Sequence, residues 1–216
     1  MTVKSKPKYI GDDAVKELLE QYECPVPFHA VRTRFLGNIA TPDLGASTLQ
    51  IVTGLWGGEL PEFNTMADAT KLMDALVQGL WNALTRHQKR SHPFRLTRPK
   101  IEVNATCLCS LARLRAEELE GFADGLFGGH TEVDLPERAH AGVGALAEMR
   151  AMTLGIIDLV ERDPLAGNRN ELETTFRHLR ELNKIMEGEI HETVMACTKA
   201  RRTMIASITT SRSTVH

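Results

Sequence analysis

The residue pair best suited to metal binding in this sequence is Glu137 and His140, which are three positions apart. On a helix this spacing places a carboxylate and an imidazole on one face, as in one half of a carboxylate-bridged metal centre. A complete centre needs a second such pair, and the sequence has no other Glu-x-x-His. The nearest substitute is the pair Glu187 and His191, which are one helical turn apart from each other. A metal-binding helical protein is therefore one hypothesis, and solvated helix faces are the alternative.

The cysteines and the familiar catalytic motifs indicate no further chemistry. Cys107 and Cys109 are separated by one residue, but a zinc site needs a matching second pair, and Cys24 and Cys197 each stand alone. Two half-buried thiols on a short strand are the alternative interpretation. The sequence lacks the glycine-rich nucleotide-binding loops, the nucleophile elbow and the zinc-protease motif. We therefore predict no catalytic residue and no cofactor.

The most prominent polar feature is a basic segment at residues 86–100, which contains no acid. Its candidate binding residues are Arg86, Lys89, Arg90, Arg95, Arg98 and Lys100. Such a segment can bind the phosphates of a nucleic acid, with His87, His92 and Phe94 available to stack on bases. Residues 117–137 carry seven acids and no lysine or arginine. The two segments can therefore neutralise each other, within one chain or between subunits; an acidic protein partner is a third interpretation.

The overall composition is that of an ordinary globular protein without a strong global charge. The chain has 216 residues, 42% of them apolar and 25% charged, and a formal net charge of -2. It can bury a core without disulfides, and its four cysteines form no disulfide framework. It shows no apolar run long enough to span a membrane and no signal-peptide pattern. We therefore expect a cytoplasmic protein with reduced thiols and no membrane partner.

The elements that must position these residues are predicted to be helices. Apolar residues recur every three or four positions, which is the period of a helix with one buried face. The clearest periodic segments are 65–84, 137–161 and 171–208. The predicted fold class is all-α: a multi-helix bundle with a long C-terminal helix. The exception is near 93–107, where apolar and polar residues alternate, and there we expect a short β-hairpin.

The predicted domain organisation has three parts. Residues 1–10, which carry three lysines and a proline, are expected to form a flexible basic arm. Residues 11–163 are expected to form the helical core domain. Residues 164–216 are expected to form the long C-terminal helix, packed on the core or on a second subunit. Its apolar face is long enough to dock a partner or a second copy of the chain.

The segment LWGGELPEF, residues 55–63, combines two large aromatic side chains with residues typical of a tight turn. Its structural residues are Trp56, Gly57, Gly58, Pro61 and Phe63. Glycine adopts left-handed backbone geometry at little cost, and proline stiffens the return of the chain. We expect Trp56 and Phe63 to fold against the helix predicted over 65–84 and to form a corner of the core. A ligand pocket at this corner is the alternative.

This segment and its surroundings resemble the YecA/YgfB-like family of uncharacterised bacterial proteins. The resemblance covers about residues 30–160 and rests on Phe35, Leu36, Pro42, Trp56, Gly57, Pro61 and Phe63, with a Gly-Phe-x-x-Gly unit at Gly121, Phe122 and Gly125. It implies an all-α fold of unknown function, and some relatives look like regulatory or protein-targeting partners. This chain departs from the family at Ala46-Ser47-Thr48-Leu49 and lacks the cysteine-rich zinc-binding tail of longer members.

Together these features predict a non-catalytic interaction protein or regulatory adaptor whose process is unknown. Binding of a protein partner, or self-association, is expected through the C-terminal helix. The alternatives are association with nucleic acid through residues 86–100 and metal binding at Glu137 and His140.

Overall fold

The computed structural model describes residues 9–162 and 169–213, and every regular element within these ranges is a helix. The elements in chain order are α1 (Asp12–Gln21), α2 (Phe28–Ala40), α3 (Thr48–Thr53), η1 (Gly54–Trp56), α4 (Met66–Met73), η2 (Asp74–Trp81), α5 (Asn82–Leu84), η3 (Thr85–Gln88), α6 (Ala105–Phe127), α7 (Glu137–Arg162) and α8 (Arg169–Ser213). The predicted all-α class, with its long C-terminal helix, is therefore confirmed. None of the described helices has the length and apolar character that a membrane span requires. Most of the predicted basic arm, residues 1–8, lies outside the described ranges.

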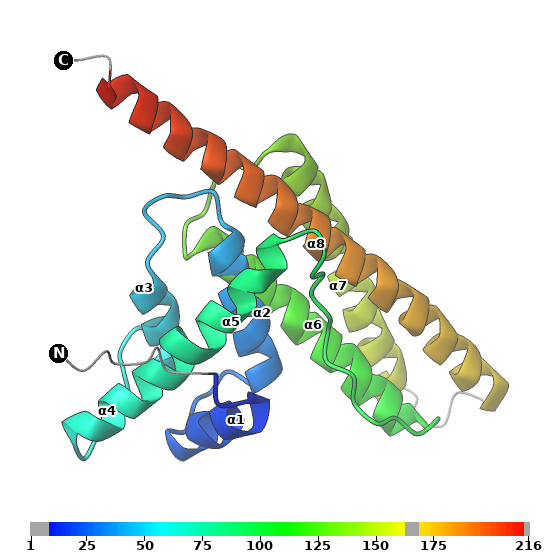
Figure 1. Cartoon of the computed structure of the whole chain (residues 1–216). Helices are drawn as coiled ribbons and strands as arrows, with labels where there is room; N and C mark the ends of the chain where they lie inside the picture. The colour runs from blue at the N-terminus through cyan, green and yellow to red at the C-terminus, as the bar shows by residue number, and fades with distance from the viewer. Residues whose placement is uncertain (1–8, 163–168, 214–216) are drawn as a thin grey trace.

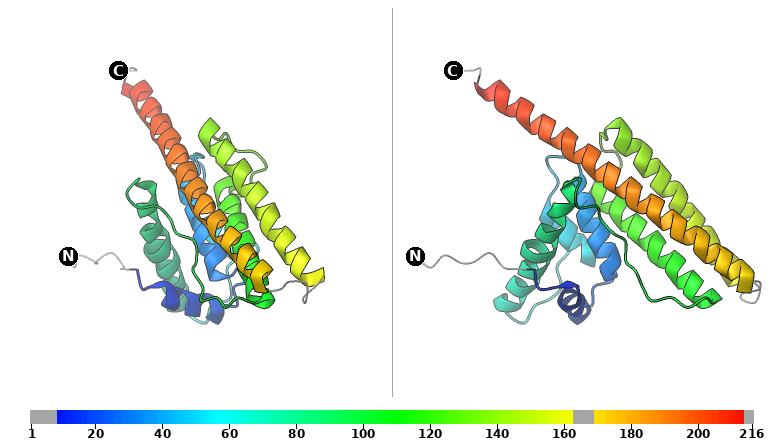
Figure 2. Two further views of the ribbon diagram at one scale, coloured as in Figure 1. Left: turned by 90° about the vertical axis from the view of Figure 1, so that its right-hand side faces the viewer. Right: turned by 45° about the vertical axis from the view of Figure 1, so that its right-hand side comes forward.

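The long helices α6, α7 and α8 lie side by side, and α2 packs along α6 (Figure 1). The shorter helices α1 and α3, together with the helix that runs from α4 to η3, cover α2 on the side away from α7 (Figure 2). As a result α2 lies in the interior, and its residues Phe35–Ala40 are all buried. The core is therefore organised around α2 and the helix that contacts it most extensively, α6.

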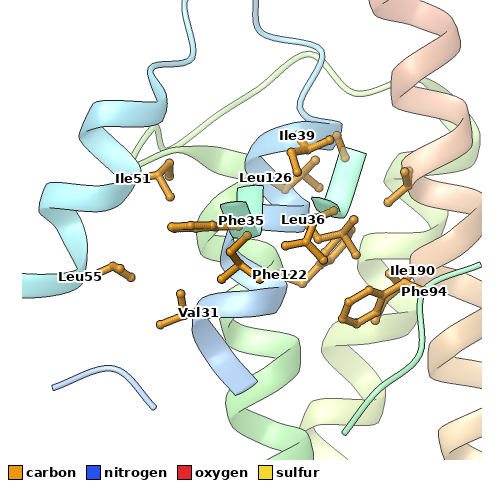
Figure 3. Packing of buried hydrophobic residues seen from close by; sticks show 14 of the residues in the cluster. Val31, Phe35, Leu36, Ile39, Ile51, Leu55, Phe94, Phe122, Leu126 and Ile190 are labelled. Atoms are coloured by element: carbon orange, nitrogen blue, oxygen red, sulfur yellow. The ribbon is translucent and has the colours of Figure 1, made fainter. Parts of the chain in front are cut away.

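Glycine residues allow α2 and α6 to touch backbone to backbone. A Cβ atom on Gly125 would lie 1.8 Å from the carbonyl oxygen of Arg34, and one on Gly37 would lie 2.2 Å from the carbonyl oxygen of Phe122. The side chains of Phe35 and Phe122, one from each helix, fill the fully buried centre beside this contact (Figure 3). The Gly-Phe-x-x-Gly unit therefore serves close helix packing.

The helix predicted over 65–84 is confirmed, because α4, η2, α5 and η3 follow one another without a break. Thr65 Oγ1 accepts a hydrogen bond from the backbone N–H of Asp68 at 3.2 Å, so Thr65 is the N-cap. The middle stretch, η2, is π-helical, and Trp81 at its end donates from Nε1 to Asn38 Oδ1 at 3.2 Å. This hydrogen bond joins the helix to α2.

Helix α8 is part of the core over most of its length. Near its start, Phe176 and Leu179 form a small hydrophobic cluster with Leu108 and Leu111 of α6. Further along, its residues Met186, Ile190, Val194 and Cys197 belong to the main cluster, which also contains residues of α2 and α7. In the described residues, therefore, α7 and α8 share one core across the boundary predicted at 163 and 164.

The predicted β-hairpin near 93–107 is wrong, because the chain forms no strand there. Residues 89–104, which we call the strap, instead run extended over the bundle before α6 begins (Figure 2). Asn104 Oδ1 accepts from the backbone N–H of Cys107 at 2.7 Å and caps α6, so Cys107 and Cys109 lie on a helix. Alternation indicates one buried and one exposed face, and a single segment lying on helices satisfies it as well as a hairpin does.

Candidate interaction surface

The strap uses part of the basic segment to bind a buried acid of α8. Arg95 Nη1 lies 2.5 Å from Glu187 Oε2, and Arg98 Nη2 lies 3.4 Å from Glu187 Oε1. The backbone N–H of Leu96 donates to Glu187 Oε1 at 3.1 Å. A buried carboxylate needs such partners to be stable. Arg95 and Arg98 therefore serve the fold as counter-charges, and Glu187 is engaged by the strap rather than placed for metal binding.

A second buried acid holds the next residue of the strap. Glu118 Oε1 accepts from the backbone N–H of Thr97 at 2.8 Å, and Arg115 Nη2 donates to the Thr97 carbonyl oxygen at 2.6 Å. Arg115 and Glu118 are both buried and form an ion pair with each other. Side chains thus satisfy the backbone groups that a hairpin partner would have bonded. Within the described ranges, Glu118 is the one acid of segment 117–137 whose hydrogen bonds reach the strap.

Two of the three side chains predicted to stack on bases are buried. His87 and Phe94 are 6% and 1% exposed, and their rings contact edge to face with centroids 5.2 Å apart. The Arg32 guanidinium lies 5.1 Å from the centre of the Phe94 ring. Burial lowers the pKa of His87, so its ring is neutral near neutral pH. A base cannot stack on either ring unless the fold rearranges.

The remaining basic residues of the segment stay free at the surface. Arg86, Lys89, Arg90 and Lys100 are exposed and form no ion pair with any residue that the structure describes. Gln88, at the end of η3, donates from Nε2 to Thr198 Oγ1 of α8 at 3.4 Å. This contact places the end of η3, and with it the start of the turn at Lys89 and Arg90, against α8 one helical turn before Arg202. Basic residues from two distant parts of the sequence therefore lie in the same region of the surface.

The basic residues near the end of α8 were not among the binding residues predicted from the sequence. Lys199, Arg201 and Arg202 lie within one helical turn, and no acid follows Glu192 in the chain. Arg201 Nη1 donates to the Thr41 carbonyl oxygen at 3.3 Å, and burial, followed by the charge of Arg202, lowers the pKa of Arg201. A count of charges along the predicted helix reveals this run, but it does not reveal the neighbouring turn.

The end of α8 extends past the other helices (Figures 1 and 2), and residues 202–209 are all exposed. We call residues 199–209 the α8 tip. Its apolar side chains are Met204, Ile205 and Ile208, which are 38%, 50% and 48% exposed. At 3.6 residues per turn, they lie on the same face as the fully buried Ile190, Val194 and Cys197, beyond the half-buried Arg201, which occupies the position between. The face that packs α8 onto the core thus continues beyond the core.

The predicted metal pair is not joined by further ligands. Glu137 and His140 are both exposed at the start of α7. In the described part of the chain, no group of three His, Cys, Asp or Glu side chains is placed to hold a metal ion.

A cavity of about 540 Å³ between α1, α2 and the strap is lined in part by a cysteine and a histidine. Its lining includes Cys24 and His29, and His29 Nε2 lies 2.7 Å from Glu117 Oε2. Burial, however, raises the pKa of the Cys24 thiol, whereas a nucleophilic cysteine needs its pKa lowered. The group that would have to attack is therefore protonated.

The aromatic corner is fixed by contacts with the end of α1. Trp56 Nε1 donates to the Tyr22 carbonyl oxygen at 2.8 Å, and the Tyr22 and Phe63 rings meet edge to face with centroids 5.3 Å apart. Gly57 and Gly58 have positive φ values of 80° and 116°, which suit glycine at a helix end. Both aromatics are half-buried against the main core.

Comparison with known proteins identifies no relative: no protein family, curated protein or solved structure matches this chain. The resemblance to the YecA/YgfB-like family therefore stays a prediction that rests on its motif residues.

Proposed function

We propose that this protein is a non-catalytic interaction protein that binds its partner with the α8 tip and the basic turn after η3. The observation that carries the proposal is the continuation of the buried α8 face into Ile205 and Ile208, which are about half exposed. An apolar helix face beside a cluster of charges is typical of a docking surface. The YecA/YgfB-like resemblance adds the expectation of a regulatory or targeting adaptor, acting in the cytoplasm.

The chemistry of the interior supports a binding role over a catalytic one. The buried carboxylates of Glu187 and Glu118 have partners in the strap, and the thiol of Cys24 is held protonated by burial. The burial of both carboxylates is explained by their role in stabilising the fold. The free charges lie at the surface, where they can meet a partner.

Nucleic-acid association is the second candidate, and it is favoured by the exposed cations Arg86, Lys89, Arg90 and Lys100. Arg95 and Arg98 are occupied by Glu187, and His87 and Phe94 are buried. What remains is a charged surface on which His92 alone of the three predicted stacking side chains is exposed, which supports this candidate less well than protein binding.

The proposal is tested by two matched substitutions in the full chain. Ile205→Asp places a charge on the apolar stripe, whereas Thr203→Asp adds the same charge on another face of the same helix. Both positions are exposed, so both variants should fold and melt like the wild type. We expect Ile205→Asp to lower retention of the native partner by about tenfold or more, and Thr203→Asp to leave it nearly unchanged.

The measurement is quantitative affinity purification from the cells that produce the protein. A partner retained equally by the wild type and the Ile205→Asp variant would contradict the assignment of this surface.

A further inference from the structure

We infer that the partner of the α8 tip is an acidic amphipathic helix of another protein. Its apolar face would cover Ile205 and Ile208, and its carboxylates would face Arg202 and the cations Lys89 and Arg90 after η3. This inference rests on the proposed function and specifies the chemistry of the partner.

The apolar part of the surface is a ledge rather than a deep pocket. Beside Met204 the chain forms a depression of about 360 Å³, whose lining includes Leu44 and Val133. Leu44 is itself 48% exposed, so the apolar surface extends from the helix onto the neighbouring loop. A ledge that is open along a helix accepts an extended amphipathic element such as another helix.

The two edges of this ledge carry opposite charges. On the side of η3, whose Gln88 contacts Thr198, lie Arg202, one turn further along α8, and the exposed Lys89 and Arg90, which follow Gln88 in the chain. Around Met204 the depression is lined by the acids Asp43, Glu132 and Asp134. A complementary partner therefore carries acids along one flank of its apolar face and no acid along the other.

This asymmetry disfavours the two other classes of anionic partner. A nucleic acid or an anionic membrane presents negative charge to the whole ledge, including the acidic edge. Proteins bind single-stranded nucleic acids by stacking aromatic side chains on the bases. No Phe, Tyr or Trp follows Phe176 in the chain. Helices at a membrane surface use Trp, Phe or Leu on their apolar face, whereas this tip offers Met204, Ile205 and Ile208.

A second copy of the chain is also a poor match. The stripe on the tip faces the same side as the body, so an antiparallel crossing of two tips is the arrangement that keeps the bodies apart. In an antiparallel pair the two-fold axis is perpendicular to both helices, and it brings the same edge of each copy to the same side. The basic edges of the two copies therefore lie against each other. Like charges in such positions repel.

The test uses three labelled synthetic helices of equal length and the full-length protein. The first probe carries a leucine face flanked by glutamate on one side and glutamine on the other. The second has lysine in place of glutamate. The third contains the residues of the first in scrambled order, so that it keeps the charge and loses the apolar face. Binding is followed by fluorescence anisotropy, in parallel with duplex DNA, single-stranded DNA and phosphatidylserine vesicles.

We expect the glutamate probe to bind at least about tenfold more tightly than the lysine or scrambled probes. Ile205→Asp and Arg202→Glu should each weaken this binding about fivefold or more, and the loss caused by Arg202→Glu should shrink more as salt rises than the loss caused by Ile205→Asp. Thr203→Asp serves as the matched control.

Four results would overturn the inference: equal binding of the three probes, no binding of the glutamate probe, preferential binding of DNA or vesicles, or a dimer in light scattering that Ile205→Asp dissociates. The last result would leave the α8 tip as the binding surface and change only the partner. Retention of the native partner by Ile205→Asp would contradict the proposed function itself, so the two failures are distinguishable.

Discussion

At the scale of residues, the buried acids Glu187 and Glu118 bind the backbone of the strap. Glu187 and Glu118 accept hydrogen bonds from consecutive backbone N–H groups, those of Leu96 and Thr97. These are the groups that an isolated extended segment leaves unpaired, and leaving them buried without a partner costs free energy. Carboxylates on α6 and α8 therefore replace the second strand that the strap lacks.

This arrangement predicts unequal effects of removing the two sides of one ion pair. Glu187→Ala leaves the Leu96 N–H without its acceptor, and we expect it to lower the free energy of unfolding by about 2 kcal/mol. Arg98→Ala removes a largely exposed partner, and we expect a cost below about 1 kcal/mol. Urea denaturation of both variants gives the comparison. Equal losses would show that the strap is not held by this carboxylate.

At the scale of elements, the contact between α2 and α6 depends on missing side chains. The Cβ of an alanine at position 125 would lie 1.8 Å from the carbonyl oxygen of Arg34, far inside van der Waals contact. Because the clash involves backbone atoms, no change of side-chain rotamer can relieve it. The two helices would have to separate, which opens the packing around Phe35 and Phe122. Sequence periodicity shows that both helices have buried faces, but it does not show which faces meet.

Gly125→Ala is therefore expected to destabilise the protein by about 3 kcal/mol or more, through overpacking. The matched control is Gly144→Ala on α7, where an added Cβ meets no atom within 4 Å. There alanine should stabilise the helix by about 0.5–1 kcal/mol, because glycine is the poorer helix former. Thermal unfolding of both variants, followed by circular dichroism, measures the difference. Similar melting temperatures would contradict the backbone contact.

At the scale of the whole molecule, α8 belongs to two environments. Its first part is an integral helix of the bundle, since Phe176 and Leu179 are buried in the small hydrophobic cluster and Ile190 is buried in the main one. Its tip extends beyond the other helices, and residues 202–209 are exposed (Figure 2). We therefore expect the buried part of α8 to contribute to the stability of the fold and the exposed tip to contribute to partner binding.

Two truncations test this separation. A chain that ends after Arg202 loses the exposed apolar residues and keeps the buried ones, so its melting temperature should change by less than about 3 °C. A chain that ends before Glu171 loses Phe176, Leu179 and Ile190, and we expect it to be unfolded or aggregated. Circular dichroism and light scattering distinguish these outcomes. A folded, monomeric product of the second truncation would show that α8 is an appendage.

The sequence by itself determined the helical class, the helix over 65–84 and the long C-terminal helix, because these follow from local periodicity. It could not determine whether the alternating residues 93–107 pair with a strand or lie on helices, because both arrangements bury the same side chains. It marked six candidate basic residues, but only the tertiary structure decided which are engaged: Arg95 and Arg98 meet Glu187, some ninety positions away, whereas Lys89 and Arg90 remain free beside α8. Likewise one face of α8 carries Cys197, then Arg201, then Ile205, and only the extent of the surrounding helices decides that this face is buried at Cys197 and exposed at Ile205.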